Sequence, residues 1–147
     1  MDFETVSPDA FGRSLRGLGL NLLVRDVARS AAFLRHVFGI ATHRESADFA
    51  IAAYGAQLFQ LHADATYGSH PLPGLLPEAG ARGAGLEIRL YDTDPDIAAA
   101  RAEAAGGVVL QPATDKPHGL REACILDLDG YAWVPSRPIH PAKEDTP

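Results

Sequence analysis

The sequence is poor in cysteine, and none of its apolar runs is long. Cys124 is the only cysteine among 147 residues, which excludes an internal disulfide and cysteine-rich zinc or iron–sulfur sites. A chain without disulfides fits a reducing compartment, so we expect a cytoplasmic protein. No apolar run approaches the roughly 18 residues that a membrane-spanning helix needs. Residues 1–5 are acidic and lack an apolar core, so we expect no signal peptide.

Positive charge is also scarce. Thirteen Lys and Arg residues stand against 19 Asp and Glu residues, which leaves a formal net charge of −6. Nucleic acids and anionic membranes both select basic surfaces, so we expect neither as a partner. The same charge favours cationic or neutral ligands over anionic ones. With 46% hydrophobic and 22% charged residues, the chain reads as one soluble globular domain, residues 1–147.

An internal repeat organises the chain. Residues 17–26 and 83–92 both begin with Gly-x-Gly-Leu, continue with alternating residues and end in aspartate. A helical pattern follows each segment, first over residues 27–38 up to Gly39. The second helix is expected to start at the N-cap Asp94 and to end at Gly106-Gly107.

Short strands are expected after each helix, so each half reads strand, helix and three strands. This pattern predicts an α+β fold with two tandem βαβββ modules. The expected strands are 41–45, 49–54 and 57–62 in the first half, and 108–110, 123–127 and 131–135 in the second. The expected boundaries are module one at 15–63, a Pro- and Gly-rich linker at 64–82, module two at 83–137 and a polar tail at 138–147.

Four short motifs in this order resemble the vicinal oxygen chelate superfamily. They are Val24-Arg25-Asp26-Val27-Ala28-Arg29-Ser30, Phe38-Gly39, Gly119-Leu120-Arg121-Glu122 and Leu126-Asp127-Leu128-Asp129-Gly130-Tyr131. This superfamily includes glyoxalase I, extradiol dioxygenases, fosfomycin-resistance enzymes and bleomycin-resistance proteins. The resemblance covers residues 15–137 and implies strands that curl around a shared open cleft. It also implies a homodimer.

Alternation along the expected strands decides which side chains share a face. Leu18, Leu20 and Leu22 form an apolar row in the first strand, which we expect to be packed. The polar side chains of the opposite rows are the candidate ligand-binding residues of the cleft. They are Asn21, Gln60, His62, Glu87, Arg89 and Tyr91. The alternative, that these rows only face water, stays open.

Metal-dependent members of the superfamily carry four ligands, and the resemblance places these positions at Gly19, Gln60, Glu87 and Val134. Only Gln60 and Glu87 have ligand atoms suited to a divalent cation. Asn21 or His62 could substitute on the same face. We therefore expect no inherited metal site and no cofactor, while the alternative allows a divalent metal bound by rearranged ligands.

The sequence identifies no catalytic residue. It has no phosphate-binding loop, no Gly-x-Ser-x-Gly elbow and no His-Glu-x-x-His pair. We expect a metal-free protein that binds a small organic molecule, similar to the bleomycin-resistance branch. The alternative is a divalent-metal-dependent lyase, isomerase or dioxygenase, so the sequence leaves open whether the protein is an enzyme. A regulatory or interaction module is a third reading, for which no positive feature was found.

Overall fold

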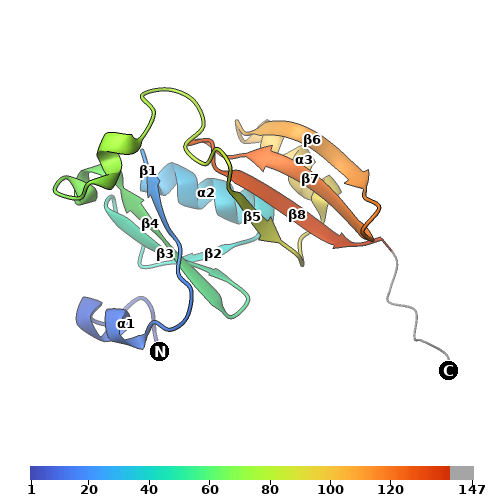
Figure 1. Ribbon diagram of the computed structural model, residues 1–147. Coiled ribbons are helices and arrows are strands. Elements are labelled where there is room, and N and C mark those ends of the chain that lie inside the picture. Colours follow the sequence, from blue (N-terminus) through green and yellow to red (C-terminus); the bar gives the residue numbers. More distant parts are fainter. Residues whose placement is uncertain (140–147) are drawn as a thin grey trace. The chain divides into compact units, whose positions relative to one another are not determined.

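The chain divides into two compact units, each built on one four-stranded sheet (Figure 1). A computed structural model describes residues 1–139, and residues 140–147 of the expected polar tail lie outside the described residues. Unit 1 is Met1–Leu76, and unit 2 begins at Pro77. Both units repeat the order strand, helix and three strands, which confirms the α+β class with two tandem βαβββ modules. Within residues 1–139, no helix combines the length and hydrophobicity that crossing a membrane requires.

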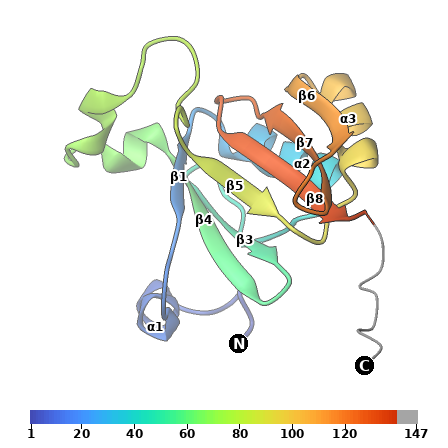
Figure 2. The same ribbon diagram turned by 45° about the vertical axis from the view of Figure 1, so that its right-hand side comes forward.

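Unit 1 has a mixed sheet in the order β1-β4-β3-β2, with β1 parallel to β4 and the other neighbours antiparallel (Figure 2). Its helix α2 starts where the Asp26 side chain accepts a hydrogen bond from the Arg29 N–H, and it ends at Gly39 with φ 69°. The elements are α1 (Pro8–Ser14), β1 (Asn21–Val24), α2 (Val27–Phe38), β2 (Ala41–His43), β3 (Phe49–Tyr54), β4 (Gln57–Ala63) and the 3₁₀ turns η1 (Asp64–Tyr67) and η2 (Leu72–Leu75).

Unit 2 repeats this topology in the order β5-β8-β7-β6, with β5 parallel to β8. Its helix α3 is capped as expected, because the Asp94 side chain accepts hydrogen bonds from the N–H groups of Asp96 and Ile97. The small side chains of Ala98 and Ala102 are fully buried on this helix. The elements are β5 (Glu87–Leu90), α3 (Pro95–Ala104), β6 (Val108–Asp115), β7 (Leu120–Leu126) and β8 (Ala132–Pro138).

The turn before β8 is organised by the side chain of Asp127. Asp127 Oδ1 accepts hydrogen bonds from the N–H groups of Asp129 (2.9 Å) and Tyr131 (3.0 Å), and Oδ2 accepts one from Trp133 Nε1 (2.8 Å). Burial raises the pKa of this carboxyl, and the three donors partly offset that rise. The turn therefore anchors the indole of Trp133, which is fully buried.

Two expectations about elements were wrong, and one helix was not foreseen. Leu18 is 93% exposed, because the chain enters the first sheet only at Asn21 and has no strand before it. Strand β6 continues to Asp115 through Pro112, since it is an edge strand whose register shifts absorb the proline. The helix α1 was missed, although Ser7-Pro8 carries its start signal and Ser7 Oγ accepts the Ala10 N–H at 3.1 Å.

Candidate ligand-binding sites in the two units

In unit 1, the structure brings the three expected polar residues together on one face of the sheet. Asn21 lies beside Gln60 in the parallel β1–β4 pair, and His62 follows two residues along β4. His62 Nε2 lies 2.9 Å from Gln60 Oε1, so the ring donates to the amide oxygen. Asn21 Nδ2 donates to Tyr67 Oη at 3.2 Å. We call this side of the sheet the open face of sheet 1, because α2 packs on the other side.

A series of contacting aromatic rings extends from the open face of sheet 1 to the helix α1. Phe49 stands opposite His62 in the β3–β4 register, and their ring centroids are 5.1 Å apart. Phe11 of α1 contacts Phe49 edge-on, with centroids 6.4 Å apart at 70°. The connected rings are His43, Phe3, Phe11, Phe49, His62, Tyr67 and His70. The short helix α1 therefore covers part of the open face through its single buried side chain, Phe11.

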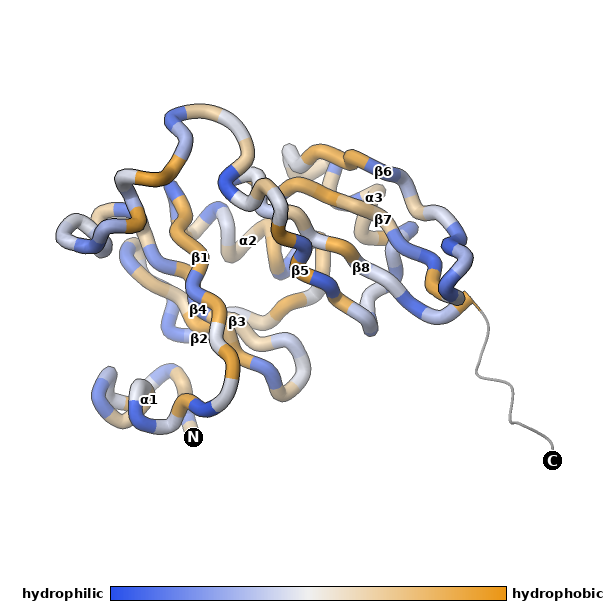
Figure 3. The backbone as a smooth tube through the Cα atoms, in the orientation of Figure 1, coloured by the Kyte–Doolittle hydropathy of each residue, from blue (hydrophilic) through white to orange (hydrophobic). Residues whose placement is uncertain are grey.

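A pocket of about 530 Å³ lies between α1 and the open face of sheet 1, and we call it the α1 pocket. The helix and the residue after it supply one wall, and β3, β4 and the segment before β3 supply the other. Mixed hydropathy along α1 fits this position at a wall (Figure 3). The lining residues are Pro8, Phe11, Gly12, Leu15, Arg44, Ser46, Phe49 and Gln60. Of the six expected ligand-binding residues, Gln60 alone lines it.

Arg44 has an unusual backbone at the rim of the α1 pocket. Its φ of 49° makes it the one non-glycine residue with positive φ among residues 1–139. Its N–H donates to Glu4 Oε1 at 2.9 Å, and its guanidinium donates to the Val6 carbonyl. Two contacts from the N-terminal segment thus hold Arg44 in this conformation. Sequence reasoning missed Arg44, because no local pattern indicates a strained arginine.

In unit 2, the expected residues Glu87, Arg89 and Tyr91 form one charged cluster. Arg89 Nη1 lies 3.2 Å from Glu87 Oε2, and the Arg89 guanidinium lies 5.5 Å from the centre of the Tyr91 ring. Arg89 Nη2 also pairs with Glu122 of β7, which was not expected as its partner. Glu122 Oε2 lies 3.5 Å from His118 Nε2 as well.

The Arg89–Glu122 pair decides what this cluster can bind. Burial alone would raise the pKa of Glu122, but the Arg89 guanidinium outweighs it, and the pKa lies below its ordinary value. The pair bridges over β8, whose residues Val134 and Ser136 are buried beneath it. Arg89 was expected among the ligand-binding residues, and in this structure it pairs with a carboxylate of its own unit.

The four inherited metal positions do not fit a divalent cation. Gly19 lies before β1 and has no ligand atom, and Val134 is an apolar side chain with 2% exposure. Gln60 Oε1 bonds to His62, and Glu87 bonds to Arg89. Among residues 1–139, no three His, Cys, Asp or Glu side chains are grouped as a metal site requires.

The thiol of Cys124 is not suited to act as a nucleophile. It is half-buried on β7, and burial raises its pKa, with the Glu87 and Glu122 carboxylates adding to the rise. A reactive thiol needs a lowered pKa and a positive neighbourhood. Cys124 has neither of these features.

The half-buried ring of His62 predicts a pH dependence of stability. Burial lowers its pKa from the ordinary 6.5, so the unfolded chain takes up a proton that the folded chain resists. Stability is therefore expected to fall as the pH drops below about 6.5, and His62→Gln is expected to flatten part of this fall. Melting temperatures between about pH 8 and pH 5 measure the effect. The exposed His36→Gln is the control, and equal slopes for wild type and His62→Gln would contradict the prediction.

Comparison with known proteins places this fold in a family. A family model described as the Glyoxalase/Bleomycin resistance protein/Dioxygenase superfamily matches residues 18–134. No curated protein sequence shows significant similarity to the chain. The match begins after α1, so this helix lies outside the part that the family model describes.

Solved structures agree with that assignment. A glyoxalase/bleomycin resistance protein/dioxygenase family enzyme from Burkholderia phytofirmans PsJN is 20% identical with a TM-score of 0.67, covering 82% of this chain and 97% of its own. A glyoxalase-related enzyme from Fulvimarina pelagi is 19% identical with a TM-score of 0.66, covering 83% and 87%. TioX from Micromonospora sp. ML1 is 24% identical with a TM-score of 0.60, covering 84% and 99%.

At these identities the structures show a shared fold, and the family model covers most of the chain. Both confirm the resemblance to the vicinal oxygen chelate superfamily that the four sequence motifs indicated. The chain therefore belongs to the glyoxalase/bleomycin resistance protein/dioxygenase superfamily.

Proposed function

We propose that this protein binds a small organic molecule without a metal, and that the α1 pocket holds it. The observation that carries the proposal is the pocket itself. Its volume of about 530 Å³ lies within the ~300–1,000 Å³ typical of small-molecule sites. Such sites combine an apolar lining with a few polar groups that orient the ligand, and the α1 pocket has this composition.

The polar groups of the pocket are suited to orientation rather than to chemistry. Gln60 is held by His62 through its oxygen, which leaves the Nε2 hydrogens to donate to a ligand. Ser46 supplies a hydroxyl and Arg44 a guanidinium. The lining contains no carboxylate, imidazole or thiol that could serve as a general base or nucleophile.

The enzymatic alternative, a metal-dependent lyase, isomerase or dioxygenase with rearranged ligands, has less support. It requires further donors beside Gln60 and Glu87, and both of these already bond to neighbours. The homodimer and the cytoplasmic location stay predictions. Sedimentation velocity on the purified chain would test the dimer.

Nuclear magnetic resonance of the labelled protein tests the proposal. We expect some members of a mixed library of small organic molecules to shift the Gln60 side-chain amide and the Gly12 and Phe49 backbone amides in a saturable way. Added chelator should not change the binding, because no metal takes part. If no compound shifts these three residues, or if every hit shifts only signals of unit 2, the α1 pocket is not the binding site.

A further inference from the structure

The α1 pocket carries a single ionisable side chain, and this decides the charge of its ligand. Seven of its eight lining residues are uncharged at any ordinary pH, and the eighth is Arg44. The chain as a whole has a net charge of −6, which favours cationic or neutral ligands at long range. Inside an apolar pocket the nearest charge dominates, because the low dielectric strengthens contacts at close range. A cationic ligand would therefore meet a like charge there.

The Arg44 guanidinium also has donors to spare. Among residues 1–139, the Arg44 guanidinium donates to the Val6 carbonyl. A guanidinium carries five N–H donors, so others remain for a ligand. The nearby Glu4 carboxylate does not pair with it, since Glu4 Oε1 accepts from the Arg44 backbone and lies 3.5 Å from His43 Nδ1. A carboxylate matches the remaining fork of donors better than a neutral acceptor does.

The apolar part of the pocket is aromatic. Phe11 and Phe49 line it from opposite walls and meet edge-on at 6.4 Å, and His62 and Tyr67 continue the series of rings. Aromatic rings prefer such edge-to-face and offset arrangements, so a further flat ring extends the series favourably. From these observations we infer that the α1 pocket selects a planar aromatic carboxylate, with the carboxylate on Arg44 and the ring beside Phe11 and Phe49. This inference rests on the proposed function and names its ligand class.

Isothermal titration calorimetry of the full chain with four probes tests the ligand class. The probes are 1-naphthoate, its neutral isostere 1-naphthamide, the aliphatic anion cyclohexanecarboxylate and the cation 1-naphthylmethylammonium. We expect 1-naphthoate to bind at least about 10-fold more tightly than each of the other three, because it alone offers both the charge and the flat ring. This comparison uses only the natural protein, so it does not depend on how a variant folds.

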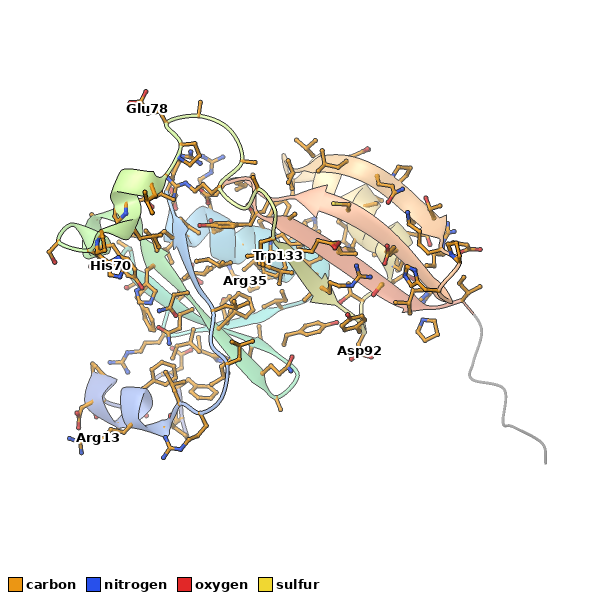
Figure 4. The ribbon with its side chains drawn as sticks, viewed as in Figure 1. Arg13, Arg35, His70, Glu78, Asp92 and Trp133 are labelled. Atoms are coloured by element: carbon orange, nitrogen blue, oxygen red, sulfur yellow. The ribbon has the colours of Figure 1, made fainter. Side chains whose placement is uncertain are left out.

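Two variants then test whether the Arg44 guanidinium is the positive charge that the ligand carboxylate meets. Arg44→Gly removes the guanidinium at a position whose positive φ suits glycine, so the fold should survive. We expect it to weaken 1-naphthoate about 10-fold or more and to weaken 1-naphthamide by clearly less, since a neutral acceptor bonds more weakly to the guanidinium. Arg13→Gln removes the same charge from α1, where Arg13 points outward and pairs with Asp9 (Figure 4). It should leave both affinities within about 2-fold, since exposed charges are screened.

The outcomes separate the ligand class from the proposed function. If naphthamide or the cation binds as well as naphthoate, or if Arg44→Gly changes nothing, the aromatic-carboxylate inference is wrong while small-molecule binding stands. If none of the four probes binds but library compounds shift Gln60 and Gly12, the inference is likewise wrong and the proposed function stands. If neither probes nor library compounds bind in the α1 pocket, both are wrong.

Discussion

Replacing Gly130 by alanine is expected to lower the free energy of unfolding by about 2–5 kcal/mol. Gly130 has a φ of 81°, which costs an L-residue about 1–2 kcal/mol. A Cβ at this position would also lie 2.4 Å from the Cα of Ala81, and a backbone atom cannot give way cheaply. The forced shift adds about 1–3 kcal/mol, as in other overpacked sites. Chemical denaturation of the purified variant measures the loss.

Gly85→Ala is the matched control for this prediction. Gly85 belongs to the same unit and has a similar φ of 87°, but a Cβ built there meets no atom within 4 Å. We expect this variant to lose only the conformational term, about 1–2 kcal/mol. Equal losses for the two variants would mean that the close approach of Ala81 to the Asp129-Gly130 turn does not constrain unit 2.

Replacing Gly12 by leucine is expected to abolish ligand binding in the α1 pocket without unfolding the protein. Gly12 lines the pocket from within α1, and a Cβ built there meets no atom within 4 Å. A leucine side chain therefore has room to enter and occupies the space that a ligand needs. Glycine is a poor helix residue, so the change also adds about 0.5–1 kcal/mol to the stability of α1. We expect the affinity of any hit from the library to fall by about 100-fold or more.

Gly12→Ala separates the two effects of that change. It supplies the helical propensity with only one added carbon, so binding should stay within a few-fold of wild type. Calorimetric affinities and melting temperatures of the three proteins give both readouts. Retained binding in Gly12→Leu would show that the ligand lies elsewhere, and a lowered melting temperature would show that Gly12 packs more tightly than the structure indicates.

The helix of each βαβββ module could be read from the sequence because its start and stop signals are local, whereas the short helix α1 was missed. The expected range 27–38 is the observed α2, since Asp26 caps it and Gly39 ends it within a few residues. The ends of the strands were less predictable. The last strand was expected to end at Pro135, yet β8 continues to Pro138, and β7 pairs with it over this extension. Strand length depends on partners distant in the sequence, which no local pattern reveals.

From the sequence it was possible to predict which candidate side chains share a face of one strand, and in one case of two paired strands. Gln60 and His62 share a face by alternation, and the parallel partner Asn21 joins them. The pairing of Arg89 with Glu122 was not predictable, because it crosses β8 and depends on the register of three strands. For the same reason the sequence could not show that Arg89 has a partner in its own unit.

Residue types and their spacing in the sequence indicated the family and the duplicated βαβββ order, and they predicted that two of the four inherited ligand positions, Gly19 and Val134, hold no ligand atom. Only the tertiary structure placed α1 against the open face of sheet 1. This brings residues 8–15 against Arg44, Ser46, Phe49 and Gln60, and their separation in sequence left no signal. The same contact places Arg44 in the lining of the pocket. At close range its positive charge outweighs the negative net charge of the chain.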